Sequence, residues 1–172
     1  MIHHSDLKFK GTMIPRGASG TKYIVLHHSG VSSRHSVHDV HSWHLHKGWA
    51  GIGYHYFITK DGEIYEGRNR DLVGAHAYGY NKMSIGVCFE GNFNKETMSL
   101  RQEEASVMLL ALLSLGYQAA TIVRHSELTK TKNCPGKNFP YERILREVDD
   151  CKKYLYSLLG KQPAALTPRQ TE

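Results

Sequence analysis

Twelve histidines occur among the 172 residues of the chain, and histidine can ligate a metal, move a proton or pair inside a core. Two of them lie where a rigid site could be built. His27 ends the apolar run at 22–27, which is typical of a buried strand, and His125 follows a second strand predicted at 121–124. Cys134 lies in the loop just beyond. Two imidazoles and one thiolate with an open fourth position match the ligand count of a catalytic zinc site.

Other interpretations of these residues stay open at this point. A free cysteine is often a small buried apolar residue, and a lone histidine is more often structural than a ligand. A rival set recurs every third residue on a helix predicted over 33–47, namely His35, His38, His41 and His44. An α-helix has 3.6 residues per turn, so this spacing spreads the four rings too widely to share one ion. We expect a solvated or packing face there, with a neighbouring pair as the alternative metal site.

Strands and helices alternate along the chain. Asp61-Gly62 between two apolar and aromatic runs predicts a β-hairpin, and Ser99 followed by Gln102 has the pattern of a helix capping box. Strands are predicted at 22–27, 54–59, 63–66, 84–89 and 121–124, and helices at 33–47, 99–115 and 141–159. This alternation predicts an α/β fold with a central sheet. The length predicts one domain over 1–159, followed by a polar, Pro-containing tail or linker over 160–172.

Composition and charge narrow the function classes. A net charge of +6 favours an anionic partner such as nucleic acid, anionic lipid or an acidic polymer. The longest apolar stretch, 107–115, is about half the roughly 20 residues that a membrane span needs, so no span is expected. The N-terminal residues have no hydrophobic segment typical of a secretory signal. Three cysteines without a disulfide spacing indicate synthesis in a reducing compartment.

Five segments, in order along the chain, carry motifs of one family. They are VLHHS at 25–29, GIGYHYF at 51–57, GAHA at 74–77, NKMSIGV at 81–87, and HSE at 125–127 followed by KNCP at 132–135. Together they resemble the zinc-dependent N-acetylmuramoyl-L-alanine amidases of the phage-lysin type, which are related to peptidoglycan recognition proteins. The resemblance spans roughly residues 20 to 155. It implies a central mixed β-sheet flanked by helices, and it makes 1–159 a single catalytic amidase domain.

The resemblance also implies ligands and a cofactor. His27, His125 and Cys134 fall on the three zinc ligands of the family, in agreement with the argument from strand ends. His76, in the GAHA motif, falls near the cleft and is expected to bind substrate, with a structural hydrogen bond as the alternative. Zn²⁺ is therefore the expected cofactor.

Two further residues are implied to assist catalysis. Tyr54 and Lys132 match a Tyr and a Lys that flank the metal in the phage enzymes. Tyr54 could orient water or donate a hydrogen bond to the developing oxyanion, and both roles stay open. Lys132 would place a cation beside that oxyanion. Cys134 lies nine positions after His125, about one more than in the compact phage enzymes, so Lys130 is a rival; proximity to Cys134 favours Lys132.

The expected activity is hydrolysis of the amide between the lactyl group of N-acetylmuramic acid and L-alanine in bacterial peptidoglycan, as a phage or prophage endolysin. The alternatives are a non-catalytic peptidoglycan-binding module and a cytoplasmic muropeptide-recycling amidase. The presence of Cys134 with both histidines favours an enzyme, because binding relatives typically lack that cysteine.

The expected partner is bacterial peptidoglycan, whose anionic wall accounts for the charge. The basic residues are dispersed, so no specific nucleic acid is expected. We expect a monomer located in the host bacterial cytoplasm until it is released to act on the wall. Phage RNA polymerase is a further candidate partner by family analogy alone.

Overall fold

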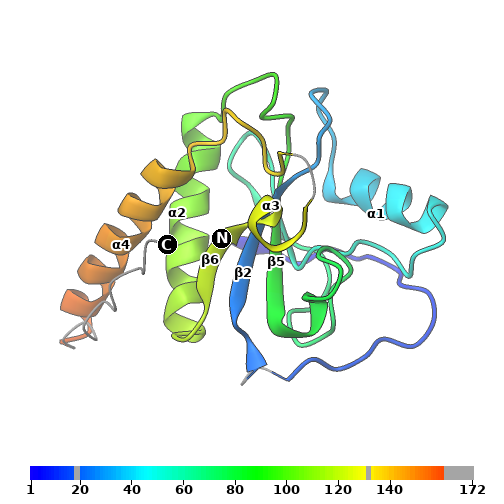
Figure 1. Cartoon of the computed structure of the whole chain (residues 1–172), viewed down its shortest axis with the longest axis horizontal. Coiled ribbons are helices and arrows are strands. Elements are labelled where there is room, and N and C mark those ends of the chain that lie inside the picture. Colours follow the sequence, from blue (N-terminus) through cyan, green and yellow to red (C-terminus); the bar gives the residue numbers. More distant parts are fainter. Residues whose placement is uncertain (18–19, 131–132, 161–172) are drawn as a thin grey trace.

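A six-stranded sheet forms the centre of the computed structural model, which describes residues 1–17, 20–130 and 133–160 (Figure 1). The strand order is β1-β4-β3-β5-β2-β6. The β3–β4 pair is the predicted antiparallel hairpin, and the other neighbouring strands pair in parallel, so the predicted mixed sheet is confirmed. The strands are β1 (Ile2–His3), β2 (Tyr23–His28), β3 (Tyr56–Ile58), β4 (Ile64–Glu66), β5 (Ser84–Phe89) and β6 (Thr121–Arg124).

Helices cover both faces of this sheet (Figure 1). One face packs against α1 (Val37–His46), and the opposite face packs against α2 (Leu100–Gly116) and α4 (Tyr141–Leu158). The single-turn α3 (His125–Leu128) follows β6 directly. The larger core therefore lies on the α2–α4 side, and a smaller apolar cluster lies under α1.

The side-chain alternation of the two central strands places the chemistry on the α1 side. Leu26 of β2 pairs with Val87 of β5, and both enter the larger core. The next pair in register, His27 and Cys88, points to the opposite face, where Cys88 packs with the cluster under α1. A polar residue is therefore tolerated at position 27 only if groups on the α1 side form hydrogen bonds with its side chain.

The elements differ from the sequence predictions in several bounds and in two additions, β1 and α3. The helix predicted over 33–47 begins at Val37, because Ser36 caps it and forms a capping box with Asp39. The N-terminal segment contains β1, which pairs with β4, although a two-residue strand carries no pattern that sequence can reveal. The tail predicted at 160–172 lies outside the described residues except for Gly160.

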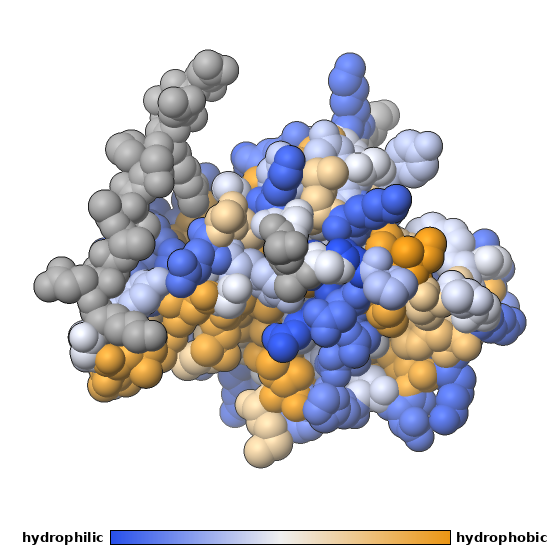
Figure 2. Space-filling view, turned by 90° about the horizontal axis from the view of Figure 1, so that it is seen from below, coloured by the Kyte–Doolittle hydropathy of each residue, from blue (hydrophilic) through white to orange (hydrophobic). Residues whose placement is uncertain are grey.

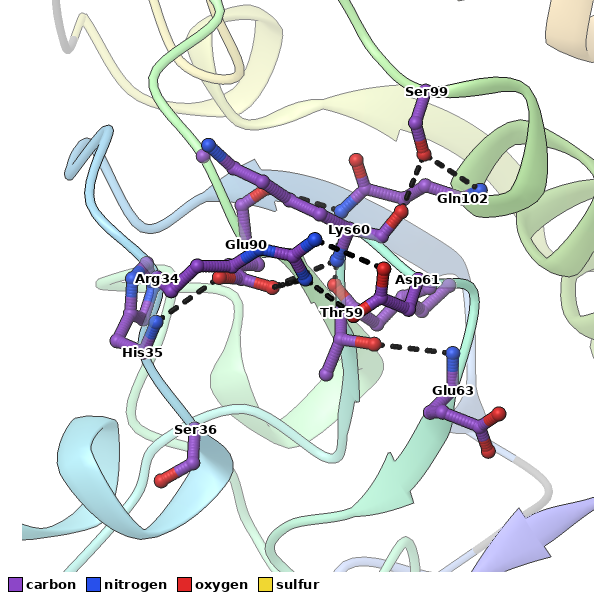
Figure 3. A network of polar contacts seen from close by, with 12 residues as sticks. Arg34, His35, Ser36, Thr59, Lys60, Asp61, Glu63, Glu90, Ser99 and Gln102 are labelled. Carbon is purple, nitrogen blue, oxygen red and sulfur yellow. Dashed lines mark hydrogen bonds and ion pairs between the residues drawn. The ribbon is translucent and has the colours of Figure 1, made fainter.

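A buried carboxylate joins the segment just before α1 to the hairpin turn (Figure 3). Glu90, directly after β5, is 1% exposed and accepts the backbone N–H groups of His35 at 3.0 Å and Lys60 at 2.7 Å. Gln102 of α2 donates its side-chain amide to the carbonyls of Ile58 and Glu90, both at 3.0 Å. These bonds fix the loops at one end of the sheet.

The start of α2 follows the predicted cap only in part. The Ser99 hydroxyl accepts the backbone N–H of Gln102 at 3.1 Å, as predicted. The Gln102 side chain does not return to the Ser99 backbone, because its amide is used inside the core. The capping box is therefore replaced by a single cap and a buried amide.

Apolar residues gather on the left of the face seen from below, the side on which α2 and α4 lie in Figure 1 (Figure 2). Met108 and Leu112 of α2 are each 48% exposed, and Leu158 and Leu159 at the end of α4 are also exposed. Within the described part of the chain, none of the helices combines the length and apolarity needed to cross a membrane.

Candidate metal centre and cleft

The three predicted ligands meet at the end of β2. His27 lies on β2, His125 begins α3 directly after β6, and β6 pairs with β2. Cys134 lies on the loop that follows, where its carbonyl accepts the backbone N–H of Ser126 at 3.0 Å. The ligand atoms of the three side chains lie within 4.8 Å of one another, and the Cys134 Sγ is 3.9 Å from Nδ1 of His27. The three residues therefore form one cluster, and their role as zinc ligands stays a prediction.

The donor set fits a zinc ion. Zn–S and Zn–N bonds of about 2.3 and 2.0 Å in a tetrahedron place neighbouring N and S ligand atoms about 3.5 Å apart. The 3.9 Å between Sγ of Cys134 and Nδ1 of His27 is close to that value. Among the described residues, these three form the group of three or more His, Cys, Asp or Glu side chains that could hold a metal ion.

Burial sets the protonation of the ligands. Burial, followed by the neighbouring His76 and His125 rings, holds the pKa of His27 well below its usual value. Burial also lowers the pKa of His125, and it raises the pKa of the Cys134 thiol to about 11. Both imidazoles are therefore neutral at pH 7 and available as ligands, whereas the thiol must lose a proton to bind a metal.

Tyr54 lies beside this cluster. Its ring centroid is 5.1 Å from that of His27 and 5.4 Å from that of His44. Burial, followed by the proximity of Cys88 and Cys134, raises the pKa of the Tyr54 phenol well above its usual value. The phenol keeps its proton at neutral pH and can donate a hydrogen bond, and its side-chain partner in the structure is the buried Cys88.

His76 is placed directly behind His27. Its Nδ1 lies 3.0 Å from Nε2 of His27, and its ring is 9% exposed. The residue also lines the cleft described below, so substrate contact stays a prediction while the hydrogen bond to His27 is observed.

A cleft of about 410 Å³ adjoins the cluster through His125. Trp49 and Tyr78 lie on its wall and are 41% and 93% exposed, and Asn81 and Thr129 also line it. Sequence reasoning missed these residues. The available signal was an aromatic residue beside a glycine in a predicted loop, as in Gly48-Trp49 and Tyr78-Gly79.

The two candidate lysines differ in what can be described. Lys132 lies outside the described residues, so its predicted role beside the cluster stays a prediction. Lys130 is described and exposed.

The histidines of the predicted helix divide between packing and solvent, within the expectation of a solvated or packing face. The Nδ1 atoms of His41 and His44 accept the backbone N–H groups of Ile52 at 3.2 Å and Gly53 at 3.0 Å. Both rings are buried, whereas His38 is exposed. These buried rings connect α1 to the loop that leads into Tyr54, and so they help to position the cleft.

The chain is similar in sequence to an amidase family, to a phage endolysin and to a peptidoglycan-recognition protein. A model described as N-acetylmuramoyl-L-alanine amidase matches residues 17–137. The endolysin of Klebsiella phage KP32 is 33% identical over 122 residues, which cover 67% of this chain and 80% of that protein. Peptidoglycan-recognition protein SC2 of Drosophila melanogaster is 33% identical over 132 residues, covering 70% and 71%.

Solved structures are similar over more of the chain. The amidase LysC from Clostridium intestinale URNW superposes with a TM-score of 0.77 at 31% identity, covering 94% of this chain and 99% of that one. Peptidoglycan recognition protein-LE in complex with tracheal cytotoxin, a monomeric diaminopimelic acid-type peptidoglycan, superposes with a TM-score of 0.71 at 30% identity. It covers 81% of this chain and 87% of that one.

Proposed function

The chain belongs to the N-acetylmuramoyl-L-alanine amidase family, and from this we propose that it is a zinc-dependent hydrolase of bacterial peptidoglycan. The bond cut is the amide between the lactyl group of N-acetylmuramic acid and L-alanine. The observation that carries the proposal is the cluster of His27, His125 and Cys134 at the edge of an open cleft, with Tyr54 beside it.

The cluster would hold zinc through Nδ1 of His27, a ring nitrogen of His125 and the thiolate of Cys134. Zinc supplies Lewis acidity and lowers the pKa of bound water to about 7. Tyr54, which keeps its proton, donates a hydrogen bond to the oxygen that gains charge as the amide carbon becomes tetrahedral. Lys132 is the residue that we propose supplies a cation to this oxygen, as the family motif implies. His27 is buried, so the cluster opens to solvent from the side of His125 and the cleft.

Substrate binding is proposed to use the cleft. The exposed rings of Trp49 and Tyr78 offer apolar faces to a sugar or peptide. The side-chain oxygen of Asn81 accepts hydrogen bonds from the backbone N–H groups of His76 and Ala77. The recognition protein that binds tracheal cytotoxin shares the fold, which supports a muropeptide as the ligand class. The net charge of +6 favours association with an anionic wall.

The biological role is proposed to be that of a phage or prophage endolysin, because endolysins are among the relatives of similar sequence. Such an enzyme acts on the wall after release from the host cytoplasm. A binding module without catalysis would not need the cysteine ligand, so the position of Cys134 in the cluster favours hydrolysis.

The test is a digest of purified peptidoglycan followed by mass spectrometry of the released products. The enzyme should release stem peptides with a free L-alanine amino terminus and leave intact glycan strands. Removal of metal with a chelator should abolish release, and one equivalent of zinc should restore it. Unchanged release by zinc-free protein would exclude the zinc mechanism, and binding without release would identify the non-catalytic module.

A further inference from the structure

A line of polar contacts runs from the backbone behind the cleft to the candidate metal cluster. The hydroxyl of Ser84, the first residue of β5, donates to the carbonyl of Tyr80 at 2.8 Å. The same oxygen lies 3.4 Å from Nε2 of His76. Nδ1 of His76 lies 3.0 Å from Nε2 of His27, whose Nδ1 faces the Cys134 Sγ at 3.9 Å.

The direction of each bond follows from proton counting. Ser84 has one hydroxyl proton, and the shorter contact gives it to Tyr80, so the oxygen can only accept from His76. Nε2 of His76 therefore carries the proton in the neutral ring, which leaves Nδ1 as an acceptor. Nε2 of His27 must then be the donor of the 3.0 Å bond. The lone pair of His27 is consequently on Nδ1, the atom that faces Cys134.

The His76 ring has little freedom to leave this arrangement. A Cβ atom added at Gly74 or at Gly86 would lie 2.5 Å from its ring atoms, so both glycines lie directly against the ring. The backbone N–H of His76 donates to Oδ1 of Asn81 at 2.8 Å. The ring is therefore closely packed, and the backbone that carries it is fixed by a hydrogen bond.

We propose that His76 is a positioning residue that selects the tautomer of His27, keeping Nδ1 free for the metal before any metal binds. The proposal rests on the zinc site proposed above and adds a role for the buried pair behind it. A ligand imidazole whose second nitrogen donates to a fixed acceptor is held in one tautomer and one orientation. Ser84 acts through His76, because its oxygen accepts the proton on Nε2 of His76 and so keeps that proton on Nε2.

A near-isosteric pair of variants separates this role from packing. In His76→Asn the side-chain oxygen can occupy the position of Nδ1 and accept from His27, whereas His76→Leu fills similar space without an acceptor. We expect His76→Leu to weaken zinc binding about 10- to 100-fold in chelator competition, and His76→Asn to stay within about threefold of wild type. A residue needed only for packing would give equal losses in the two variants, which would overturn the proposal.

The tautomer itself can be measured in the metal-free protein by long-range ¹H–¹⁵N NMR of the imidazoles at pH 7.5. We expect His27 to carry its proton on Nε2 in wild type and in His76→Asn, and to be a mixture in His76→Leu. The same tautomer in all three proteins would contradict the proposal. If wild type binds no zinc, the proposed function fails. The spectrum still tests separately whether His76 selects the tautomer of His27.

Ser84→Ala gives a second, milder test if His76→Leu does not fold. It removes the hydroxyl that faces His76 but keeps the hydrogen bond between the His76 ring and the Ser84 backbone, so it should shift the His27 spectrum toward a mixture less than His76→Leu does. Ser106→Ala is the matched control, because Ser106 is also fully buried and its hydroxyl also donates to a backbone carbonyl, that of Gln102. Equal effects of the two serine variants on the His27 spectrum would overturn the proposed line of hydrogen bonds from Ser84 through His76 to His27. A raised KM with unchanged zinc affinity in both His76 variants would instead assign His76 to substrate binding and overturn the positioning role.

Discussion

The same burial acts in opposite directions on the thiol and the imidazoles of the candidate metal cluster. It raises the pKa of Cys134 to about 11, because the charged form of a thiol is the thiolate. It lowers the pKa of His27 and His125, because their charged form is the cation. All three groups are therefore neutral at pH 7 without metal, and zinc binding must displace the proton of Cys134.

Replacement of Cys134 by serine should abolish tight zinc binding and amidase activity together, because a hydroxyl does not supply the thiolate ligand. Cys134 is half-buried and serine is nearly isosteric, so the fold should persist. Metal analysis, circular dichroism and the peptidoglycan digest measure the three properties. Cys151→Ser on α4 is the matched control, since Cys151 is also a half-buried free cysteine, and it should behave as wild type. A Cys134→Ser protein that retains stoichiometric zinc and full activity would contradict the ligand assignment.

Lys132→Ala should keep zinc binding and lower kcat by about 100-fold, the scale of losing one donor to a developing oxyanion. Lys130→Ala is the control, because Lys130 is exposed and should leave kcat within about twofold of wild type. Steady-state digestion with both variants loaded with zinc measures the difference. An active Lys132→Ala beside an inactive Lys130→Ala would assign the role to Lys130.

At the level of elements, the buried amide of Gln102 joins α2 to one end of the central strands β3 and β5. Its two hydrogen bonds satisfy carbonyls at the ends of β3 and β5, where the sheet pairing stops. The sequence suggested a cap at this position because Gln is three residues after Ser99. Whether such a side chain turns to the cap or into the core depends on which acceptors the sheet presents, and those come from residues 44 and 12 positions away.

Gln102→Met should lower the free energy of unfolding by roughly 1–3 kcal/mol, because it keeps the volume and leaves buried carbonyls with fewer partners. Urea unfolding at pH 7.5 measures the change. Glu104→Met, an exposed neighbour on α2, should change the stability by less than about 0.5 kcal/mol. Equal effects of the two substitutions would mean that the amide bonds carry no net stability.

For the molecule as a whole, buried histidines couple stability to pH. Burial, ahead of all other causes, lowers the pKa of His44 and of His55 to about 4, below the value of about 6.5 in an unfolded chain. The unfolded state therefore binds more protons between these values. Their contribution to stability is complete above pH 6.5 and is lost as the pH falls toward 4 and below.

Unfolding free energies measured in urea from pH 7.5 to 4.5 should fall with decreasing pH, chiefly below pH 6.5. His44→Asn should flatten this slope, because the Asn oxygen can accept the Gly53 N–H in place of Nδ1 but does not titrate there. His38→Asn replaces an exposed ring on the same helix and should keep the wild-type slope. A slope that is identical in all three proteins would contradict a role for His44.

Local patterns predicted the hairpin, the strand at 84–89 and the two histidines at strand ends, because these features depend on residues close in sequence. The loop after the second strand added Cys134 as the third candidate ligand, the family motifs agreed with this set, and the structure brings all three residues together. The bounds of α1 were predicted less well, since Ser33 to His35 are held outside the helix by contacts such as the bond between His35 and the distant Glu90.

By itself, the sequence determined the alternation of strands and helices, the family, and the three residues able to hold a metal. Only the tertiary structure decided what other histidines do: His41 and His44 bind the backbone of the loop before Tyr54, and His76 contacts His27 from 49 positions away. The physical reason is that a hydrogen bond is set by distance and direction in space. Two nearly identical imidazoles differ only in which atoms the fold places beside them.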